Sequence, residues 1–136
     1  MAKEDKRAVA TRLYEIFDAG DVAGLDDVVD QQLIDHNPVP GATSGIDGMR
    51  TLVAAVRDGF SDTHHELLYQ ADPGDGWVVN QWRMTGKHTG DWFGQPATGR
   101  RVSFTGIDLL RVDHGKITEI RHAEELMQLQ QQLIPA

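Results

Sequence analysis

Hydrophobic residues change their spacing about half-way along the chain. In the first half they recur every three or four positions, which is typical of helices that pack on one side. This spacing predicts a helix at residues 9–17, a short helix at 22–30, and a third helix that starts at Ser44 and buries an apolar face over 49–56. Closely spaced prolines and glycines predict a loop over residues 32–45.

After Phe60, β-branched and aromatic residues alternate with turn residues, which indicates strands. The four predicted strands form an antiparallel meander and cover residues 64–72, 76–90, 99–113 and 115–125. Tight turns of sequence DPGDG and DHGK join two of the pairs, and a longer glycine-rich loop joins the third. The tail from 125 to 136 carries leucines at helical spacing and predicts a closing helix.

This order of elements, helices first and a long sheet second, predicts an α+β fold. Three N-terminal helices would pack on one face of a strongly curved antiparallel sheet, with a pocket left between the two layers. The length of 136 residues predicts a single domain, 1–136.

Composition and charge exclude several classes of function. The chain is 40% hydrophobic and 25% charged, which is typical of a soluble globular protein. It contains no cysteine, which excludes thiol nucleophiles, disulfides and cysteine-ligated metal centres. A net charge of -8 disfavours nucleic acid as a partner, and no segment predicts a signal peptide or a membrane span. We therefore expect a cytoplasmic protein.

The last two predicted strands form a hairpin that carries an acid and an imidazole, Asp108 and His122. A three-residue loop at the DHGK turn would place these side chains diagonally on one face, about 7 to 8 Å apart at Cα. Their neighbours on that face are the hydrophobic residues Leu110, Val112 and Ile120. A carboxylate and a histidine in such a pocket can exchange a proton near neutral pH, so we interpret them as a catalytic pair.

Two alternatives remain open for this pair. A two-residue loop would change the parity of the register and send Asp108 and His122 to opposite faces of the sheet. The pair could also have no part in any reaction, if Asp108 only satisfies a buried histidine or if one of the two side chains reaches solvent at the sheet edge.

Several other residues are candidates for contact with a substrate. Trp82 and His88 share one strand face, and with two aromatic residues of the following loop they could form a flat slot over a planar ligand. Core packing explains the tryptophans equally well. Asn37 could orient a carbonyl group, although asparagine before proline more often builds a turn. The predicted substrate-binding set is Asn37, Trp82, His88, Trp92, Phe93, Leu110 and Ile120.

Sequence motifs give no sign of a bound cofactor or metal. The glycine-rich dinucleotide and phosphate loops, the serine nucleophile elbow and the HExxH motif are all absent. His64 and His65 are adjacent, so on a strand they point to opposite faces and cannot share one metal ion. The residues therefore favour acid–base chemistry on a bound organic molecule.

The segment WRMTGKHTGDWFGQPATGRRVSFTGIDLLRVDHGKITEI, with LMQLQQQL near the end, resembles the SnoaL-like polyketide cyclase family. The resemblance extends from about His36 onward. It implies a cone-shaped barrel, in which a strongly curved sheet wraps around helices, and a homo-oligomer such as a dimer or tetramer. It also implies a polycyclic aromatic substrate, a place in bacterial antibiotic biosynthesis and a cyclase reaction without a cofactor.

The resemblance also bears on the reaction. In the aldol cyclases of the family a histidine comes first and an aspartate follows it, whereas here Asp108 comes first and His122 second. This exchanged order resembles the anthracycline hydroxylase branch. It implies that molecular oxygen is a co-substrate, that a separate reductase uses NADPH to reduce the substrate, and that His122 protonates the oxygen that leaves a hydroperoxide.

Three functions are therefore open. The main hypothesis is a cofactor-independent hydroxylase component of anthracycline biosynthesis. The first alternative is a polyketide aldol cyclase that closes a ring of a methyl-ester precursor, and the second is a non-catalytic ligand-binding module of the same fold. Oxygen uptake distinguishes the two enzymes, and turnover distinguishes both from a binding module.

Overall fold

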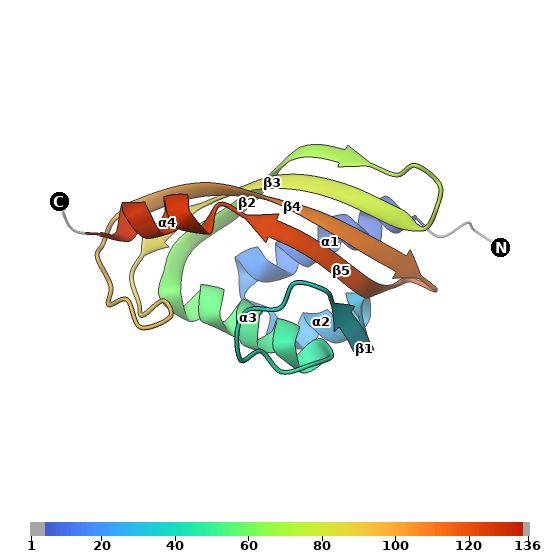
Figure 1. Cartoon of the computed structure of the whole chain (residues 1–136), viewed down its shortest axis with the longest axis horizontal. Coiled ribbons are helices and arrows are strands. Elements are labelled where there is room, and N and C mark those ends of the chain that lie inside the picture. The colour runs from blue at the N-terminus through green and yellow to red at the C-terminus, as the bar shows by residue number, and fades with distance from the viewer. Residues whose placement is uncertain (1–4, 135–136) are drawn as a thin grey trace.

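The structure is a computed structural model that describes residues 5–134 (Figure 1). In chain order its elements are α1 (Lys6–Ala19), the 3₁₀ helix η1 (Val22–Gly24), α2 (Leu25–Val28), β1 (Val29–Asp35), α3 (Ile46–Gly59), β2 (Phe60–Ala71), β3 (Trp77–His88), β4 (Arg101–Asp113), β5 (Lys116–Glu124) and α4 (Leu126–Leu133). The predicted helices and all four predicted strands are present. Residues 135–136 of the predicted tail helix lie outside the described residues.

The strands form one curved sheet in the order β1-β5-β4-β3-β2. Strands β2 to β5 are an antiparallel meander, as predicted, but β1 pairs with β5 in parallel. The predicted antiparallel pairing holds for β2 to β5, and the parallel edge strand β1, which was not predicted, makes the sheet mixed. The strand β1 was not predicted, because hydrophobic and polar residues do not alternate strictly along it. It lies at the sheet edge and buries only Val29 and Leu33.

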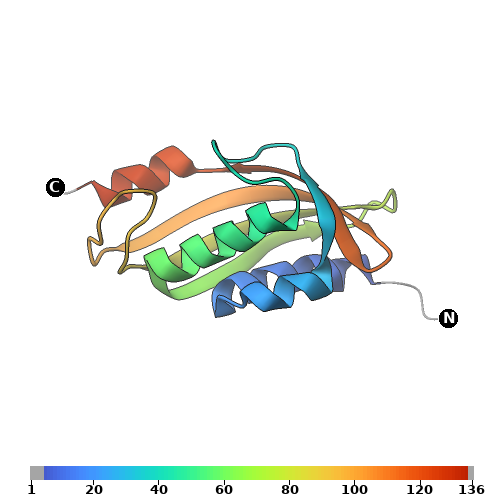
Figure 2. The same cartoon turned by 90° about the horizontal axis from the view of Figure 1, so that it is seen from below.

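The helices α1, α2 and α3 lie together on one face of the sheet, below it in Figure 1 and in front of it in Figure 2. The sheet curves over them, and α4 packs against β4 at one end. The predicted α+β fold with a sheet wrapped around three N-terminal helices is confirmed. None of the helices within residues 5–134 is long and apolar enough to cross a membrane.

Glycines set the ends of two helices. The helix α1 stops at Gly20, whose φ of 64° is left-handed. The helix α3 begins at Ile46 after Gly45, and not at Ser44 as predicted. Gly45 has a φ of 71°, and a Cβ atom there would lie 2.8 Å from the carbonyl oxygen of Gln31, so only glycine fits this position.

The β4–β5 hairpin turns through two residues, His114 and Gly115, with φ values of 50° and 75°. The predicted three-residue loop is therefore wrong. A two-residue loop alone would send Asp108 and His122 to opposite faces, but a bulge in β5 at Thr118 adds one residue and restores the parity. Asp108 and His122 are directly opposed partners on one face, closer than the predicted diagonal.

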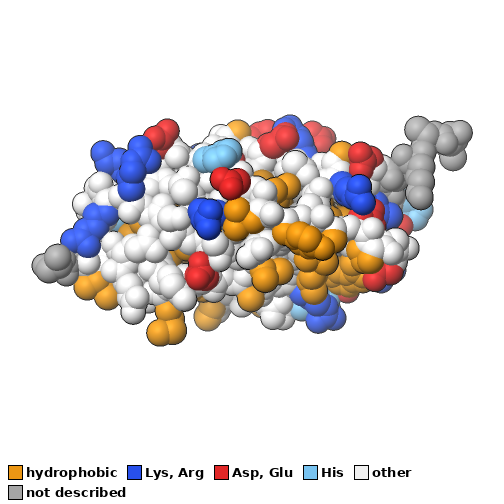
Figure 3. All heavy atoms as spheres, turned by 90° about the horizontal axis from the view of Figure 1, so that it is seen from above, with side chains coloured by type: hydrophobic (Ala, Val, Ile, Leu, Met, Phe, Trp, Pro, Cys, Tyr) orange, Lys and Arg blue, Asp and Glu red, His pale blue; other side chains and the backbone are white. Residues whose placement is uncertain are grey.

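The outer face of the sheet, seen from above in Figure 3, carries acidic and basic side chains among scattered hydrophobic ones. Tyr69 and Ile107 are large hydrophobic residues that remain exposed on β2 and β4. The homo-oligomer implied by the family resemblance stays a prediction.

Gly106 gives Trp82 its position on the inner face. The two residues are paired across β4 and β3, and a Cβ atom on Gly106 would lie 2.2 Å from the indole ring. The missing side chain therefore lets the indole lie across β4, where its Nε1 atom reaches Asp108 at 3.0 Å.

We expect Gly106→Ala to lower the free energy of unfolding by roughly 1–3 kcal/mol, because the added methyl group displaces the buried indole. Urea denaturation followed by tryptophan fluorescence measures the change. Ser103→Ala, on the outer face of the same strand, is the control and should change stability by less than about 0.5 kcal/mol. Equal stability of Gly106→Ala and the wild type would contradict this packing.

Candidate active site

A cavity of about 670 Å³ lies between the inner face of the sheet and the helices, a size that suits a small organic ligand. Most of its wall is hydrophobic or aromatic. Four of the predicted substrate-binding residues belong to it, namely Trp82, Trp92, Phe93 and Ile120, and so do both residues of the predicted catalytic pair. The ionisable side chains in its described lining are Tyr14, Asp35, His65, Asp108, His122 and Glu124, with no lysine or arginine.

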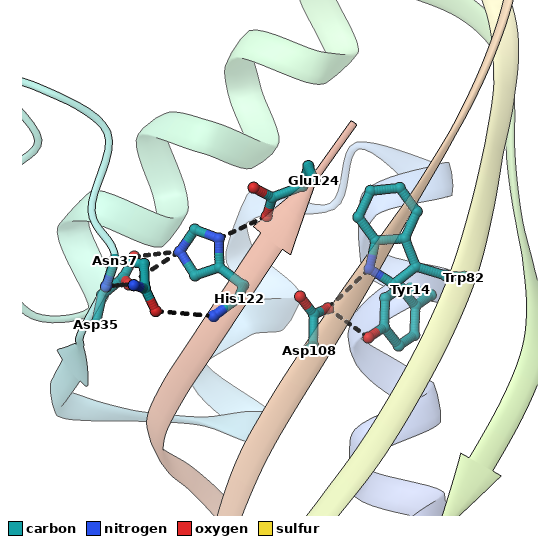
Figure 4. Close-up of polar contacts among 7 residues, drawn as sticks. All are labelled: Tyr14, Asp35, Asn37, Trp82, Asp108, His122 and Glu124. Carbon is teal, nitrogen blue, oxygen red and sulfur yellow. Dashed lines mark hydrogen bonds and ion pairs between the residues drawn. The ribbon is translucent and has the colours of Figure 1, made fainter. Parts of the chain in front are cut away.

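Asp108 lies on the inner face of β4 with only 6% of its surface exposed. Its Oδ2 atom accepts hydrogen bonds from the Tyr14 hydroxyl at 2.5 Å and from Trp82 Nε1 at 3.0 Å (Figure 4). No described residue donates a hydrogen bond to its other oxygen, Oδ1, which keeps access to the cavity. Asp108 therefore has one oxygen that is held and one that is free to take a proton.

The pKa of Asp108 reflects opposing influences. Burial is the largest of them and, with the charge of Glu124, raises the pKa to about 6. The Tyr14 hydrogen bond, the charge of His122 and the Trp82 hydrogen bond favour the ionised form and limit the rise. Burial and the charge of Asp108 raise the pKa of Tyr14 well above its usual value, so the phenol remains a donor.

A chain of two amides, a buried one and a half-buried one, fixes the Tyr14 hydroxyl. Asn80 is completely buried and donates from Nδ2 to the Tyr14 oxygen at 3.3 Å. Gln70 in turn donates to Asn80 Oδ1 at 2.9 Å. Asn80 is also the direct partner of Asp108 across β3 and β4, so the sheet itself sets how Tyr14 meets Asp108.

His122 on β5 is held by two carboxylates. Its Nδ1 atom lies 2.5 Å from Glu124 Oε1, and its Nε2 atom lies 2.9 Å from Asp35 Oδ1 (Figure 4). Because carboxylates only accept, both ring nitrogens donate and the ring is an imidazolium. Burial lowers the pKa of this ring, but the hydrogen bond and charge of Glu124 and the charges of Asp35 and Asp108 outweigh burial and raise the pKa to about 9.

The structure brings Asp108 and His122 to the same cavity, but no hydrogen bond joins the two side chains. The alternative in which Asp108 only satisfies a buried histidine is wrong, because the partners of His122 are Asp35 and Glu124. Proton exchange between Asp108 and His122 would therefore pass through a ligand or solvent in the cavity.

Three predicted substrate-binding residues lie outside the cavity lining. Leu110 is completely buried in the core, and so is His88, whose Nδ1 atom accepts a hydrogen bond from the backbone of Thr98 at 3.2 Å. Asn37 Oδ1 accepts the backbone N–H of His122 at 3.0 Å and so ties the loop after β1 to β5. The structure supports a packing or anchoring role for these residues and not contact with a substrate.

Three residues of the site were not predicted from the sequence: Tyr14, Asp35 and Glu124. Glu124 is two positions from His122 on one strand, so the alternation of strand faces could have revealed it. Tyr14 lies next to the hydrophobic stripe of α1, and the helical spacing that reveals this stripe does not mark a tyrosine as part of a site. Asp35 was assigned to a loop, although it ends β1.

Within residues 5–134, no group of three histidine, aspartate or glutamate side chains has the arrangement of a metal site. His64 and His65 point to opposite faces, as predicted: the side chain of His64 is 70% exposed and that of His65 is 6% exposed.

Comparison with known proteins identifies the family. The SnoaL-like polyketide cyclase family matches residues 7–133. The chain belongs to this family. It is 32% identical over 117 residues to the aklanonic acid methyl ester cyclase DauD of Streptomyces sp. (strain C5), an alignment that covers 81% of this chain and 70% of DauD.

Solved structures share the fold of this SnoaL-like protein. TsrD from Streptomyces laurentii superimposes with a TM-score of 0.83 at 26% identity and covers 96% of this chain and 98% of its own. AclR from Streptomyces galilaeus, which has been proposed to be a hydroxylase, has a TM-score of 0.80 at 21% identity and covers 96% of this chain and 82% of its own. At such identity the likeness to AclR concerns the fold alone.

Within the SnoaL-like family, the comparisons favour the cyclase alternative over our main hypothesis of a hydroxylase. DauD, which is 32% identical over the aligned 117 residues, is named as a cyclase, whereas the likeness to AclR concerns the fold. Molecular oxygen, NADPH and a reductase partner stay predictions.

We expect Glu124→Gln to lower the pKa of His122 from about 9, because the variant removes the charge and the charge-assisted hydrogen bond that raise it. A pH titration of the imidazole nitrogen shifts by NMR measures the midpoint. Glu66→Gln, at an exposed position on β2, is the control and should leave the midpoint in place. An unchanged midpoint in Glu124→Gln would contradict the assigned role of this carboxylate.

Proposed function

We propose that the protein catalyses an intramolecular aldol ring closure of a polycyclic aromatic polyketide, with Asp108 as general base and His122 as general acid. The observation that carries this proposal is the free oxygen of Asp108, which shares a cavity with a protonated imidazole. With pKa values of about 6 for Asp108 and about 9 for His122, the base is ionised and the acid is protonated between these limits.

The reaction would begin when Asp108 removes a proton from a carbon next to a carbonyl group and leaves an enolate. The enolate carbon then forms a C–C bond with a ketone carbon of the same molecule. His122 gives its proton to the ketone oxygen, which becomes a hydroxyl group. The product is an isomer of the substrate, and the proton held by Asp108 returns to His122 through solvent, so the step needs no oxidant or reductant.

The two carboxylates beside His122 suit different tasks in this reaction. Glu124 holds Nδ1 and keeps the ring oriented, as the acid does in a catalytic triad. Asp35 lies at Nε2, and its side chain is the more exposed of the two. We infer that the ketone oxygen of the substrate takes the place of Asp35 on Nε2.

The charge of the cavity favours an uncharged ester over a free acid. Its described lining holds the carboxyl groups of Asp35, Asp108 and Glu124 and no lysine or arginine to balance a further carboxylate. A methyl ester avoids this repulsion. The name of the related DauD, a cyclase of a methyl ester, supports the same substrate class.

Incubation with aklanonic acid methyl ester, followed by chromatography and an oxygen electrode, tests this function. We expect an isomeric ring-closed product without oxygen uptake. Asp108→Asn should lower kcat by about 10² to 10⁴, because the amide cannot accept the carbon-bound proton. Asp113→Asn, at the exposed end of the same strand, is the matched control and should retain wild-type activity.

The other possible outcomes of this experiment distinguish the alternative functions. Ring closure by Asp108→Asn at the wild-type rate would remove Asp108 as the base. Oxygen uptake that requires NADPH and a reductase would instead support hydroxylation, and tight binding without turnover would support a binding module. The free acid should react more slowly than the ester if the charge argument holds.

A further inference from the structure

A second pair of histidine and carboxylate borders the cavity and has no part in the reaction above. His65 on β2 lines the cavity, and its side chain is almost completely buried. Its Nδ1 atom lies 2.6 Å from Asp18 Oδ1, and its backbone N–H donates to Asp18 Oδ2 at 2.9 Å. Both oxygens of Asp18 therefore bind His65.

A bulge in β2 selects His65 for the inner face. The register shifts just before His64, where Asp62 has a φ of 57°, an uncommon conformation for a residue other than glycine. Strand alternation from the inward Phe60 would otherwise point His64 to the cavity. The extra residue reverses this parity, so that His65 faces the cavity and His64 faces solvent.

Asp18 occupies a position where a helix disfavours a carboxylate. It lies in the last turn of α1, where the aligned backbone dipoles carry partial negative charge. The same turn contains no basic residue that would compensate. The close pairing with His65 offsets this unfavourable placement, together with a longer contact of 3.7 Å from His64 Nδ1 to Asp18 Oδ2.

Aromatic rings fix the plane of the His65 imidazole. The rings of Tyr14, Phe17 and Trp82 lie 5.6, 5.8 and 5.2 Å from it between centroids. Tyr14 and Trp82 are also the two donors to Asp108, so His65 adjoins the residues that hold the base. With Nδ1 engaged by Asp18, the Nε2 atom of His65 has no hydrogen-bond partner among the described residues.

We propose that His65 binds an oxygen substituent of the substrate through Nε2 and so sets the orientation of the fused rings over Asp108. Asp18 is then a positioning residue, which holds Nδ1 so that Nε2 remains available to the ligand. The inference rests on the proposed function for the ligand class, a fused-ring aromatic with hydroxyl or keto groups. A purely structural pair that only joins α1 to β2 would make no use of Nε2.

His65→Asn separates these two roles, because its amide still reaches Asp18 but places no atom at Nε2. The probes are 2-naphthol and naphthalene, which differ by one hydroxyl group, and equilibrium dialysis gives the Kd of each. The preference of the protein for 2-naphthol is the Kd of naphthalene divided by the Kd of 2-naphthol. We expect this ratio to be about 3- to 10-fold lower in His65→Asn than in the wild type, which is the range for one hydrogen bond. The Kd of naphthalene should stay unchanged, which also shows that the variant is folded.

The nitrogen chemical shift of His65 Nε2 in the wild-type protein gives an independent measurement. Saturating 2-naphthol should move this shift and naphthalene should not. Glu66→Gln, at an exposed position on the same strand, is the matched control that should alter neither result. The proposal would be overturned if the preference for 2-naphthol over naphthalene were the same in His65→Asn as in the wild type. It would also be overturned if 2-naphthol left the Nε2 chemical shift unchanged. These measurements involve no turnover, so a failure of ring closure and a failure of His65 to bind the hydroxyl group are distinguishable.

Discussion

The hydrogen bonds from Tyr14 and Trp82 to a single oxygen of Asp108 are the interaction on which this site depends. Burial raises the pKa of Asp108, and these two donors favour the ionised form and limit the rise to about 6. The two donors come from α1 and β3, so the same contacts also join the helical layer to the sheet. Gly106 makes room for the Trp82 ring, and Asn80 holds the Tyr14 hydroxyl.

His122 lies directly opposite Asp108 in the β4–β5 hairpin, but its ring has different neighbours. Two carboxylates surround its ring, so the proton stays on His122 at a pH where Asp108 has lost its own. Both pKa values are raised, to about 6 for Asp108 and about 9 for His122, so they lie on either side of neutral pH and define Asp108 as the base and His122 as the acid. The fold thus supplies both partners of a proton transfer, and the bound substrate determines which bonds are made.

The sequence predicts the elements of this fold better than their pairing. Helical spacing and strand alternation are local, so α1, α3 and the four meander strands could be recognised from the pattern. The common face of Asp108 and His122 was predicted correctly but through the wrong turn, since a two-residue loop and the Thr118 bulge together give the same parity. No local signal distinguishes these two routes.

The carboxylates of the site were harder to predict for a related reason. Asp35 meets His122 only because β1 pairs in parallel with β5, a contact between residues far apart in the sequence. Whether His64 or His65 faces the cavity likewise depends on one bulge in β2. Such single-residue shifts reverse every side chain that follows, and they are set by tertiary packing.

The most direct test of this account is the ionisation of Asp108 itself, followed by the carbon NMR shift of its carboxyl group across a pH titration. We expect a midpoint at about pH 6 in the wild type. In Tyr14→Phe the midpoint should move to higher pH, because the variant loses the hydrogen bond that favours the ionised form. Two results would contradict the role of these hydrogen bonds: a wild-type midpoint near the ordinary value of an exposed aspartate, about 3.9, or the same midpoint in Tyr14→Phe as in the wild type.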